Sequence, residues 1–222
     1  MISHENIYRY VYRDKRAGGN WVKNLRGRKP YRKRYGSGDQ RRGAIKNRVS
    51  IDERPPIVAD KIRIGDWVGD TVIGKNQQGA LVTLADRVSR YTLAGLVKSN
   101  VAAVIQSLFE PYRDICHTIT FDNGKEFTGH ETIEAYLDAA IFFAHTYHSW
   151  ERGLNENTNG LIRQYFPKGS NLLKVKTEQV AFVINQMNHR PRKCLDWKTP
   201  YEVFFGQPST WAKSALNVSL RI

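Results

Sequence analysis

The chain has 222 residues, of which 41% are hydrophobic and 25% charged; these are ordinary globular values that argue against wholesale disorder. No apolar stretch approaches the roughly 20 residues of a membrane span, and two cysteines cannot staple a secreted fold, so we expect a cytoplasmic protein. The 35 Lys and Arg residues against 21 Asp and Glu give a net charge of +14, which favours a polyanionic partner such as nucleic acid. A ribosomal or merely soluble basic protein is the alternative.

Residues 3 to about 15 have the pattern of an amphipathic helix. Ser3 is a suitable N-cap, and apolar residues follow it at spacings of three and four: Ile7, Tyr8, Val11 and Tyr12. One helix cannot bury its own apolar face. We therefore interpret residues 1–17 as the last piece of a larger domain or as a helix that docks on something else.

Residues 18–56 have little periodicity and read as an extended basic linker that ends at two prolines. The first 56 residues hold 16 Lys and Arg against 5 Asp and Glu, whereas the remainder holds 19 against 16. We interpret the linker as an arm that follows DNA phosphates, and a solvated hinge is the alternative. The candidate phosphate contacts lie in the run RGRKPYRKR (26–34): Arg28, Lys29, Arg32, Lys33 and Arg34.

From residue 57 the pattern changes to short runs of alternating and β-branched residues. It predicts three strands, a helix, a strand, a helix and a fifth strand, and then further helices. The ranges are 66–74, 80–86, 90–97, 101–109, 117–121, 128–138 and 140–144, with later helices at 156–166 and 177–188 and a short capped helix from Pro200. This order predicts an α/β fold: a mixed five-stranded, ribonuclease H-like sheet flanked by helices, occupying residues 57–222 with a helical C-terminal tail.

Three carboxylates fit a metal site in such a fold. Phosphoryl transfer on DNA uses two divalent ions about 3.5–4 Å apart, and Mg²⁺ prefers oxygen ligands. Asp70 lies in the first predicted strand, Asp122 ends the fourth, and Glu156 opens a later helix. Because the first and fourth strands are neighbours in this sheet, the three should converge. Each also has an ordinary explanation, since Asp-Asn-Gly is a common turn and Glu suits a helix N-terminus.

The surrounding residues resemble the DDE core of transposases and retroviral-type integrases, most closely the IS-thirty family of bacterial insertion-sequence transposases. Here 51 residues separate Asp70 from Asp122, and 33 separate Asp122 from Glu156. The resembling stretches are ISHENIYRYVY (2–12), WVGDTVIGK (67–75), TFDNGKEF (120–127), SWERGLNENTNGLIRQYFPKG (149–169) and NHRPRKCLDWKTPYEVF (188–204). The resemblance implies that Asp70, Asp122 and Glu156 are catalytic and hold two Mg²⁺ or Mn²⁺ ions.

Two departures from the family pattern stand out. The chain begins at what resembles the closing helix of an N-terminal helix-turn-helix, so residues 1–17 would be the remnant of that DNA-binding region. The family has Glu where this chain has Val68, two residues before Asp70 and on the same strand face. We expect lower activity than in relatives, unless Asp66 partly substitutes for the missing carboxylate.

Other residues are candidates for supporting roles. Asp66, Asn123 and Asn155 are predicted to support the metal ligands. The candidate DNA contacts near the site are basic side chains, and Arg163 follows Glu156 by two helical turns: Arg163, Lys125, Arg152 and Lys168. The sequence has no spacing typical of a zinc site and no phosphate-binding loop, so we expect no nucleotide cofactor.

The predicted function is metal-dependent cleavage at transposon ends followed by transfer of the 3′-hydroxyl into target DNA. The resemblance implies double-stranded DNA as partner, a homo-oligomer on paired ends, and a cytoplasmic protein that associates with the nucleoid when bound to DNA. Two alternatives remain at this point. One is a truncated DNA-binding remnant that inhibits full-length copies, and the other is a different ribonuclease H-like nuclease.

Overall fold

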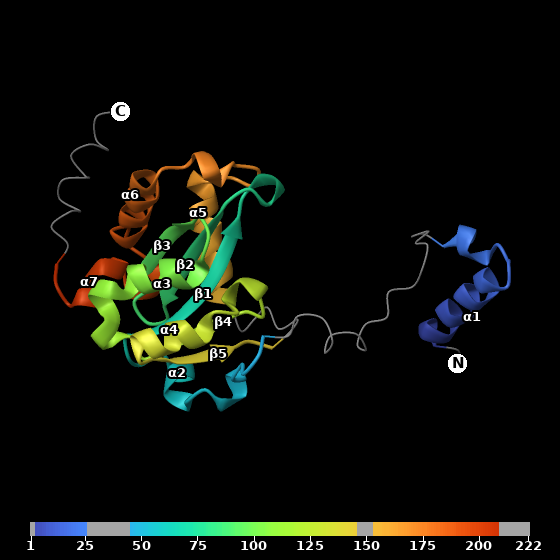
Figure 1. Ribbon diagram of the computed structural model, residues 1–222, viewed down its shortest axis with the longest axis horizontal. Coiled ribbons are helices and arrows are strands. Elements are labelled where there is room, and N and C mark those ends of the chain that lie inside the picture. Colours follow the sequence, from blue (N-terminus) through green and yellow to red (C-terminus); the bar gives the residue numbers. More distant parts are fainter. Residues whose placement is uncertain (1–2, 26–44, 146–152, 209–222) are drawn as a thin grey trace. The chain divides into compact units, whose positions relative to one another are not determined.

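The computed structural model describes residues 3–25, 45–145 and 153–208, and the chain divides into two units, Met1–Gly43 and Ala44–Ile222 (Figure 1). The first unit contains helix α1 (His4–Arg16), which begins as predicted at Ser3, whose side chain accepts a hydrogen bond from the Asn6 amide. None of the helices in the described ranges is long and apolar enough to cross a membrane.

The second unit contains one five-stranded sheet in the order β3-β2-β1-β4-β5. The strands are β1 (Asp66–Ile73), β2 (Ala80–Asp86), β3 (Thr92–Val97), β4 (Thr118–Phe121) and β5 (Ala140–Phe143). The first three pair antiparallel, whereas β4 runs parallel to β1 and β5 parallel to β4. The predicted mixed, ribonuclease H-like arrangement is confirmed.

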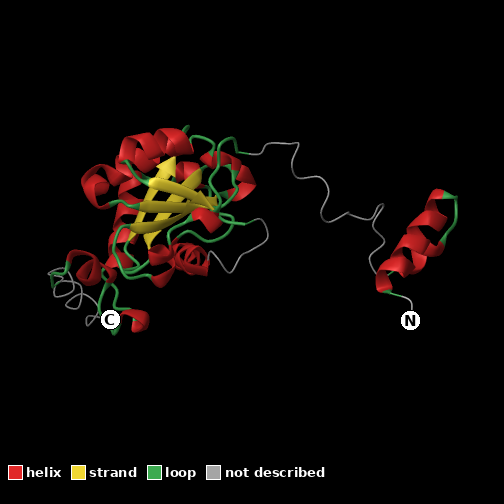
Figure 2. Cartoon of the chain, turned by 90° about the horizontal axis from the view of Figure 1, so that it is seen from below, coloured by secondary structure: helices red, strands yellow, loops and turns green. Residues whose placement is uncertain are grey.

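Helices lie on both sides of this sheet (Figure 2). They are α2 (Pro56–Asp60), α3 (Val101–Phe109), α4 (His130–Leu137), α5 (Gly153–Tyr165), α6 (Thr177–Asn188) and α7 (Pro200–Phe205). Local signals fix several ends: the Asn100 side chain caps α3 through the Ala102 amide, and Thr199 and Glu202 form a capping box on α7. Two features differ from expectation, since α2 was not predicted and α5 begins at Gly153, three residues earlier than expected.

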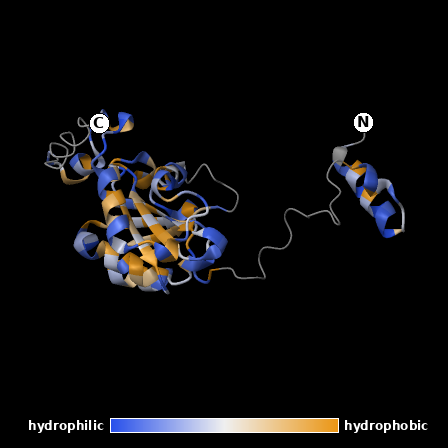
Figure 3. Ribbon diagram, turned by 90° about the horizontal axis from the view of Figure 1, so that it is seen from above, coloured by the Kyte–Doolittle hydropathy of each residue, from blue (hydrophilic) through white to orange (hydrophobic). Residues whose placement is uncertain are grey.

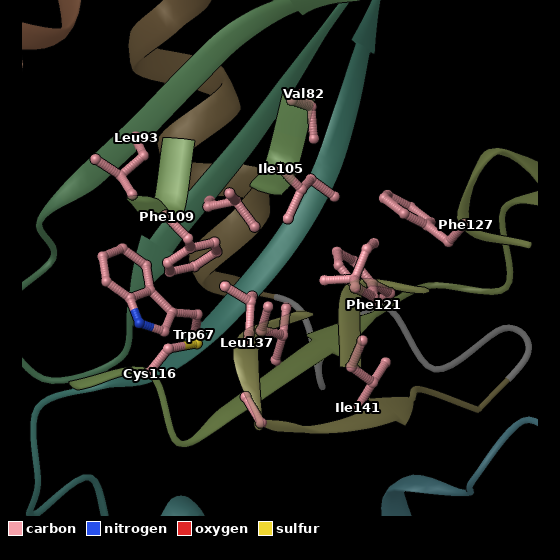
Figure 4. Close-up of a cluster of buried hydrophobic side chains, with 14 of the residues drawn as sticks. Trp67, Val82, Leu93, Ile105, Phe109, Cys116, Phe121, Phe127, Leu137 and Ile141 are labelled. Atoms are coloured by element: carbon pink, nitrogen blue, oxygen red, sulfur yellow. The ribbon is translucent and has the colours of Figure 1, made fainter. Parts of the chain in front are cut away.

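Alternate residues of the strands face two different apolar clusters. Figure 3 shows hydrophobic segments in the strands and in the helices of this unit. On the side of α3 and α4, Trp67 and Phe121 are fully buried with large side chains from the helices (Figure 4). The Trp67 ring meets that of Phe109 edge-on at 5.0 Å between centroids. On the other side, Val72 of β1 packs with Ile162 of α5 in a second cluster.

The end of the predicted linker contacts the sheet. Ile45 is buried in the first core, the Val49 carbonyl accepts a hydrogen bond from the Phe143 amide at 2.9 Å, and Arg54 donates to the Thr120 hydroxyl at 3.2 Å. These contacts come from single residues rather than from a regular element, which is why the sequence pattern does not reveal them. The segment that packs with the sheet thus begins before residue 57, the predicted start of the domain.

Candidate active site

Two of the three predicted carboxylates belong to adjacent parallel strands. Val68 of β1 lies opposite Thr120 of β4, and the same register continued by two residues brings Asp70 level with Asp122. Neighbouring strands are about 4.8 Å apart, and both residues are half-buried. Continued in this way, the register predicts that Asp70 and Asp122 lie close together, and Asp70 is on the face that packs against α5.

The Asp70 carboxylate is oriented by two donors. Its Oδ1 accepts a hydrogen bond from the Thr71 amide at 2.8 Å, and its Oδ2 accepts one from Nδ2 of Asn159 on α5, also at 2.8 Å. The Asn159 Oδ1 in turn accepts a bond from the Thr83 hydroxyl of β2 at 3.1 Å. Neither Asn159 nor Thr83 was predicted as a site residue, and no sequence spacing signals a contact across 89 positions.

The Asp122 carboxylate sits in the turn that follows β4. Its Oδ1 accepts a hydrogen bond from the Gly124 amide at 2.9 Å. A Cβ on Gly124 would lie 2.8 Å from that oxygen and 2.6 Å from an oxygen of Glu126, so a side chain here would displace both carboxylates. Glu126 also accepts a hydrogen bond from the Thr71 hydroxyl at 2.6 Å. The strand position after Asp70 is therefore tied to the turn that carries Asp122.

Glu156 occupies the first turn of α5 and is exposed. Within the residues that the structure describes, no three or more Asp, Glu, His or Cys side chains are gathered so that they could hold a metal ion. The closeness of Asp70 and Asp122 thus follows from the continued strand register, and Glu156 does not form a group of three with them. With 3.6 residues per turn, Glu156 lies about 60° around α5 from Asn159, at the rim of the face that meets β1.

The paired carboxylates fit a divalent cation by their chemistry. Both offer hard oxygen donors, which Mg²⁺ and Mn²⁺ prefer. An ionised carboxylate has about four acceptor positions, so it can take a hydrogen bond and bind a cation at once. Asp70 and Asp122 are the residues that would hold such an ion.

The three predicted supporting residues have different surroundings. Asn155 is buried and its Nδ2 donates to the Gly69 carbonyl at 3.1 Å, next to Asp70. Asn123 donates to the Ala144 carbonyl at 2.5 Å and accepts from Arg48, so it fixes the turn after Asp122. These two contacts hold the backbone beside the carboxylates rather than the carboxylates themselves.

Asp66 lies elsewhere. It is buried at the start of β1, where Arg63 donates two hydrogen bonds of 3.0 Å to its carboxylate and the Thr118 hydroxyl donates one of 2.8 Å. Four strand residues separate it from Asp70 by about 13 Å. Asp66 therefore does not substitute for a carboxylate at position 68, because its side chain is engaged by Arg63 at the far end of the strand.

The known proteins that are similar to this chain include transposases of several insertion sequence elements. The chain is 49% identical over 210 residues to the transposase for insertion sequence element IS4351 of Bacteroides fragilis, covering 92% of this chain and 64% of that protein. It is 36% identical over 212 residues to the transposase for IS1086 of Cupriavidus metallidurans, covering 91% and 62%. Identity to transposase InsI for IS30A of Escherichia coli is 33% over 212 residues, covering 91% and 55%. The chain is a homologue of IS30-family transposases.

It spans less than two thirds of the length of these curated relatives. No protein-family model matches the chain. Among solved structures, the catalytic core domain of BIV integrase aligns with a TM-score of 0.49 at 16% identity, covering 64% of this chain and 94% of that one. The fold assignment rests on the strand order and directions described above.

The predicted DNA contacts that the structure describes differ in their exposure. Lys125 and Lys168 are exposed, whereas Arg163 is half-buried and donates from Nη2 to the Ile73 carbonyl at 2.9 Å. The other Arg163 amino group, Nη1, is buried and has no hydrogen-bond partner among the described residues. The remaining predicted contacts lie outside the described residues: Arg28, Lys29, Arg32, Lys33, Arg34 and Arg152.

Val68, the position where the family resemblance predicts Glu, is buried on the same face as Asp70. The side chain of Arg54 reaches Thr120, the residue directly opposite Val68. Burial, and secondarily the positive charge of Arg54, lower the pKa of Arg87 to about 10.

Proposed function

We propose that this chain carries the catalytic domain of a DNA transposase that cleaves phosphodiester bonds at transposon ends and joins the freed 3′-hydroxyl to target DNA. The observation that supports the proposal is the register of β1 against β4, in which Val68 lies opposite Thr120, in a homologue of transposases. Continued by two residues, this register would bring Asp70 level with Asp122. A structural pair of acidic residues at such an edge would gain nothing from repelling each other, whereas a pair of metal ligands needs this closeness.

In this proposal Asp70, Asp122 and Glu156 are ligands for two Mg²⁺ or Mn²⁺ ions. Bound there, the ions would activate the attacking oxygen and neutralise the leaving oxygen. Asp70 keeps its orientation through Thr71 and Asn159, and Asp122 keeps its own through the Gly124 amide. Because the carboxylates act only as ligands, the reaction needs no covalent bond between protein and DNA.

The proposed partner is double-stranded DNA, both transposon ends and target, bound by a homo-oligomer without a nucleotide cofactor. The net charge of +14 and the exposed side chains of Lys125 and Lys168 support a polyanionic partner. Since each neutralised phosphate releases counterions, DNA affinity should fall steeply as salt rises. Lys125 is the stronger candidate of the two, because it lies three residues after Asp122.

The test is nicking of supercoiled plasmid by the purified chain with Mg²⁺ or Mn²⁺ at low salt. We expect metal-dependent nicking that falls by about 100-fold or more in Asp122→Ala, because several kcal/mol of charge stabilisation would be lost at about 1.4 kcal/mol per tenfold. The matched control is Asp114→Ala, which removes an exposed carboxylate from the turn Glu110–Ile115.

Three results would contradict the proposal. One is nicking that survives Asp122→Ala, and another is nicking that Asp114→Ala abolishes equally. The third is salt-sensitive DNA binding without any nicking, which would instead favour a DNA-binding remnant. Preferential cutting of RNA–DNA hybrids or of branched junctions would point to a different ribonuclease H-like nuclease.

A further inference from the structure

We propose that Asn159 is the positioning residue that orients the Asp70 carboxylate and sets the rotation of α5 over β1. This inference rests on the proposed function, in which Asp70 is a metal ligand. Its basis is the 2.8 Å hydrogen bond from Asn159 Nδ2 to Asp70 Oδ2, which joins two elements 89 residues apart in the chain.

The direction of the Asn159 amide is determined by its neighbours. A carboxylate only accepts hydrogen bonds, so the amide must present its NH₂ group to Asp70. Its oxygen then faces β2, where the Thr83 hydroxyl donates to it at 3.1 Å. The same hydroxyl lies 3.2 Å from the backbone carbonyl of Asp70. The hydroxyl has one hydrogen, so it donates to one of these two oxygens at a time, and when it donates to Asn159 it holds the amide in one orientation.

Asn155 supplies a second anchor, one turn earlier on the helix. Its buried amide donates to the Gly69 carbonyl, the residue before Asp70. Two asparagines four positions apart therefore donate hydrogen bonds to two consecutive residues of β1. A helix held at two points on the same face cannot roll about its axis without breaking one of these bonds.

These two hydrogen bonds affect the position of Glu156, which lies between Asn155 and Asn159 in the sequence. Rolling α5 about its axis moves Glu156 along an arc relative to Asp70, so the anchors decide how near the third carboxylate comes. Of the two, only Asn159 touches a proposed ligand directly. Loss of Asn159 should therefore weaken metal binding more than it weakens the fold.

The experiment measures Mn²⁺ binding without DNA, as the Mn²⁺ concentration that gives half of the maximal rise in Tm, alongside the metal dependence of nicking. Residues that hold a metal ligand in place typically contribute about 10- to 100-fold to metal affinity. We expect Asn159→Ala to raise the half-maximal Mn²⁺ concentration by about tenfold or more in both assays. The matched control is Asn157→Ala, which changes an exposed asparagine on the same helix and should leave the value unchanged.

Thr83→Val provides an independent variant, because it keeps the shape of a buried side chain and removes only the hydroxyl. It should raise the Mn²⁺ requirement by a smaller factor. Since Thr83 acts through Asn159, the double variant should require no more Mn²⁺ than Asn159→Ala alone. A purely structural role would instead lower Tm in each variant without moving the Mn²⁺ requirement. If Asn159→Ala does not fold, Thr83→Val decides by the same criterion.

Asp70→Asn separates this inference from the function on which it rests. If that variant keeps the full Mn²⁺ response, the proposed function is wrong. If it loses the response while Asn159→Ala and Thr83→Val bind Mn²⁺ as the unchanged chain does, the function stands and the positioning role is overturned.

Discussion

The two faces of strand β1 do different work, although their residues alternate along the same eight positions. Trp67 points to the side of α3 and α4, where it is fully buried among aromatic and aliphatic groups. Asp70 points to the side of α5, where amide and hydroxyl groups of Asn159 and Thr83 surround it. The comparison teaches that both faces bury apolar groups, since Val72 packs with Ile162 on the side of α5, and that the side of α5 holds the hydrogen-bonded Asp70 carboxylate in addition.

The largest expected effect concerns the apolar face. Trp67→Ala should lower the free energy of unfolding by about 3–5 kcal/mol, because it leaves a cavity against Phe109 and Phe204. Trp67→Phe should cost much less. It keeps a ring in place and removes an indole N–H that is buried without a hydrogen-bond partner in the described residues.

Urea denaturation measures the free energy of unfolding of both variants. Nicking per folded molecule measures whether a change on the Trp67 face of β1 affects the Asp70 face. We expect both variants to keep the metal requirement of the unchanged chain, since Trp67 points away from Asp70. If a fully folded Trp67 variant needed a different metal concentration for nicking, the two faces of β1 would not be independent. The packing around Trp67 would then influence the carboxylates directly.

Sequence reasoning succeeded where a pattern is local. Alternation and β-branched runs predicted the five strands. Position in the predicted fold together with family resemblance proposed Asp70, Asp122 and Glu156 as metal ligands, and this assignment stays a prediction. Sequence reasoning could not find Asn159, because its role depends on how α5 is rotated over a strand 89 residues away. It also proposed Asp66 as a partial substitute for the carboxylate missing at position 68. The alternation of side chains along a strand gives the face of a residue, but it does not reveal that Arg63 already engages the Asp66 side chain.

A smaller effect on stability concerns the two cysteines, one of which lies in the apolar core and the other on the surface. Cys116 is buried in the core of the α3 and α4 side, and Cys194 is exposed. Burial raises the pKa of the Cys116 thiol to about 12 from an ordinary value of 9.0. Between these values the unfolded chain has lost a proton that the folded chain keeps. Stability from this group is therefore complete below pH 9 and declines as pH rises toward 12.

The expected slope is about 1.4 kcal/mol per pH unit within that window. Urea unfolding between pH 8 and pH 10.5 should show a steeper loss for the unchanged chain than for Cys116→Ala, and the difference isolates this thiol from other titrating groups. A disulfide-exchange reagent at pH 8 should modify Cys194 quickly and Cys116 only on unfolding. Equal rates for the two thiols would mean that the core opens more readily than its burial implies.

The smallest effect on stability, and the sharpest test of the comparison, concerns Val68, an apolar residue on the polar face. Arg54 donates a hydrogen bond to Thr120, the residue opposite Val68. A carboxylate at position 68 would lie two residues from Asp70 on the same strand face, where it would add a hard oxygen ligand near the proposed metal site. Val68→Glu should raise metal-dependent nicking while the chain stays folded, as judged by circular dichroism at the assay temperature.

Val68→Gln is the matched control, because it has nearly the same size and no charge, and it should not raise nicking. If Val68→Glu and Val68→Gln change nicking equally, position 68 acts through packing and not through charge. If Glu alone raises nicking, the chemistry of this face extends two residues along β1, and the low activity expected of this chain traces to one missing carboxylate.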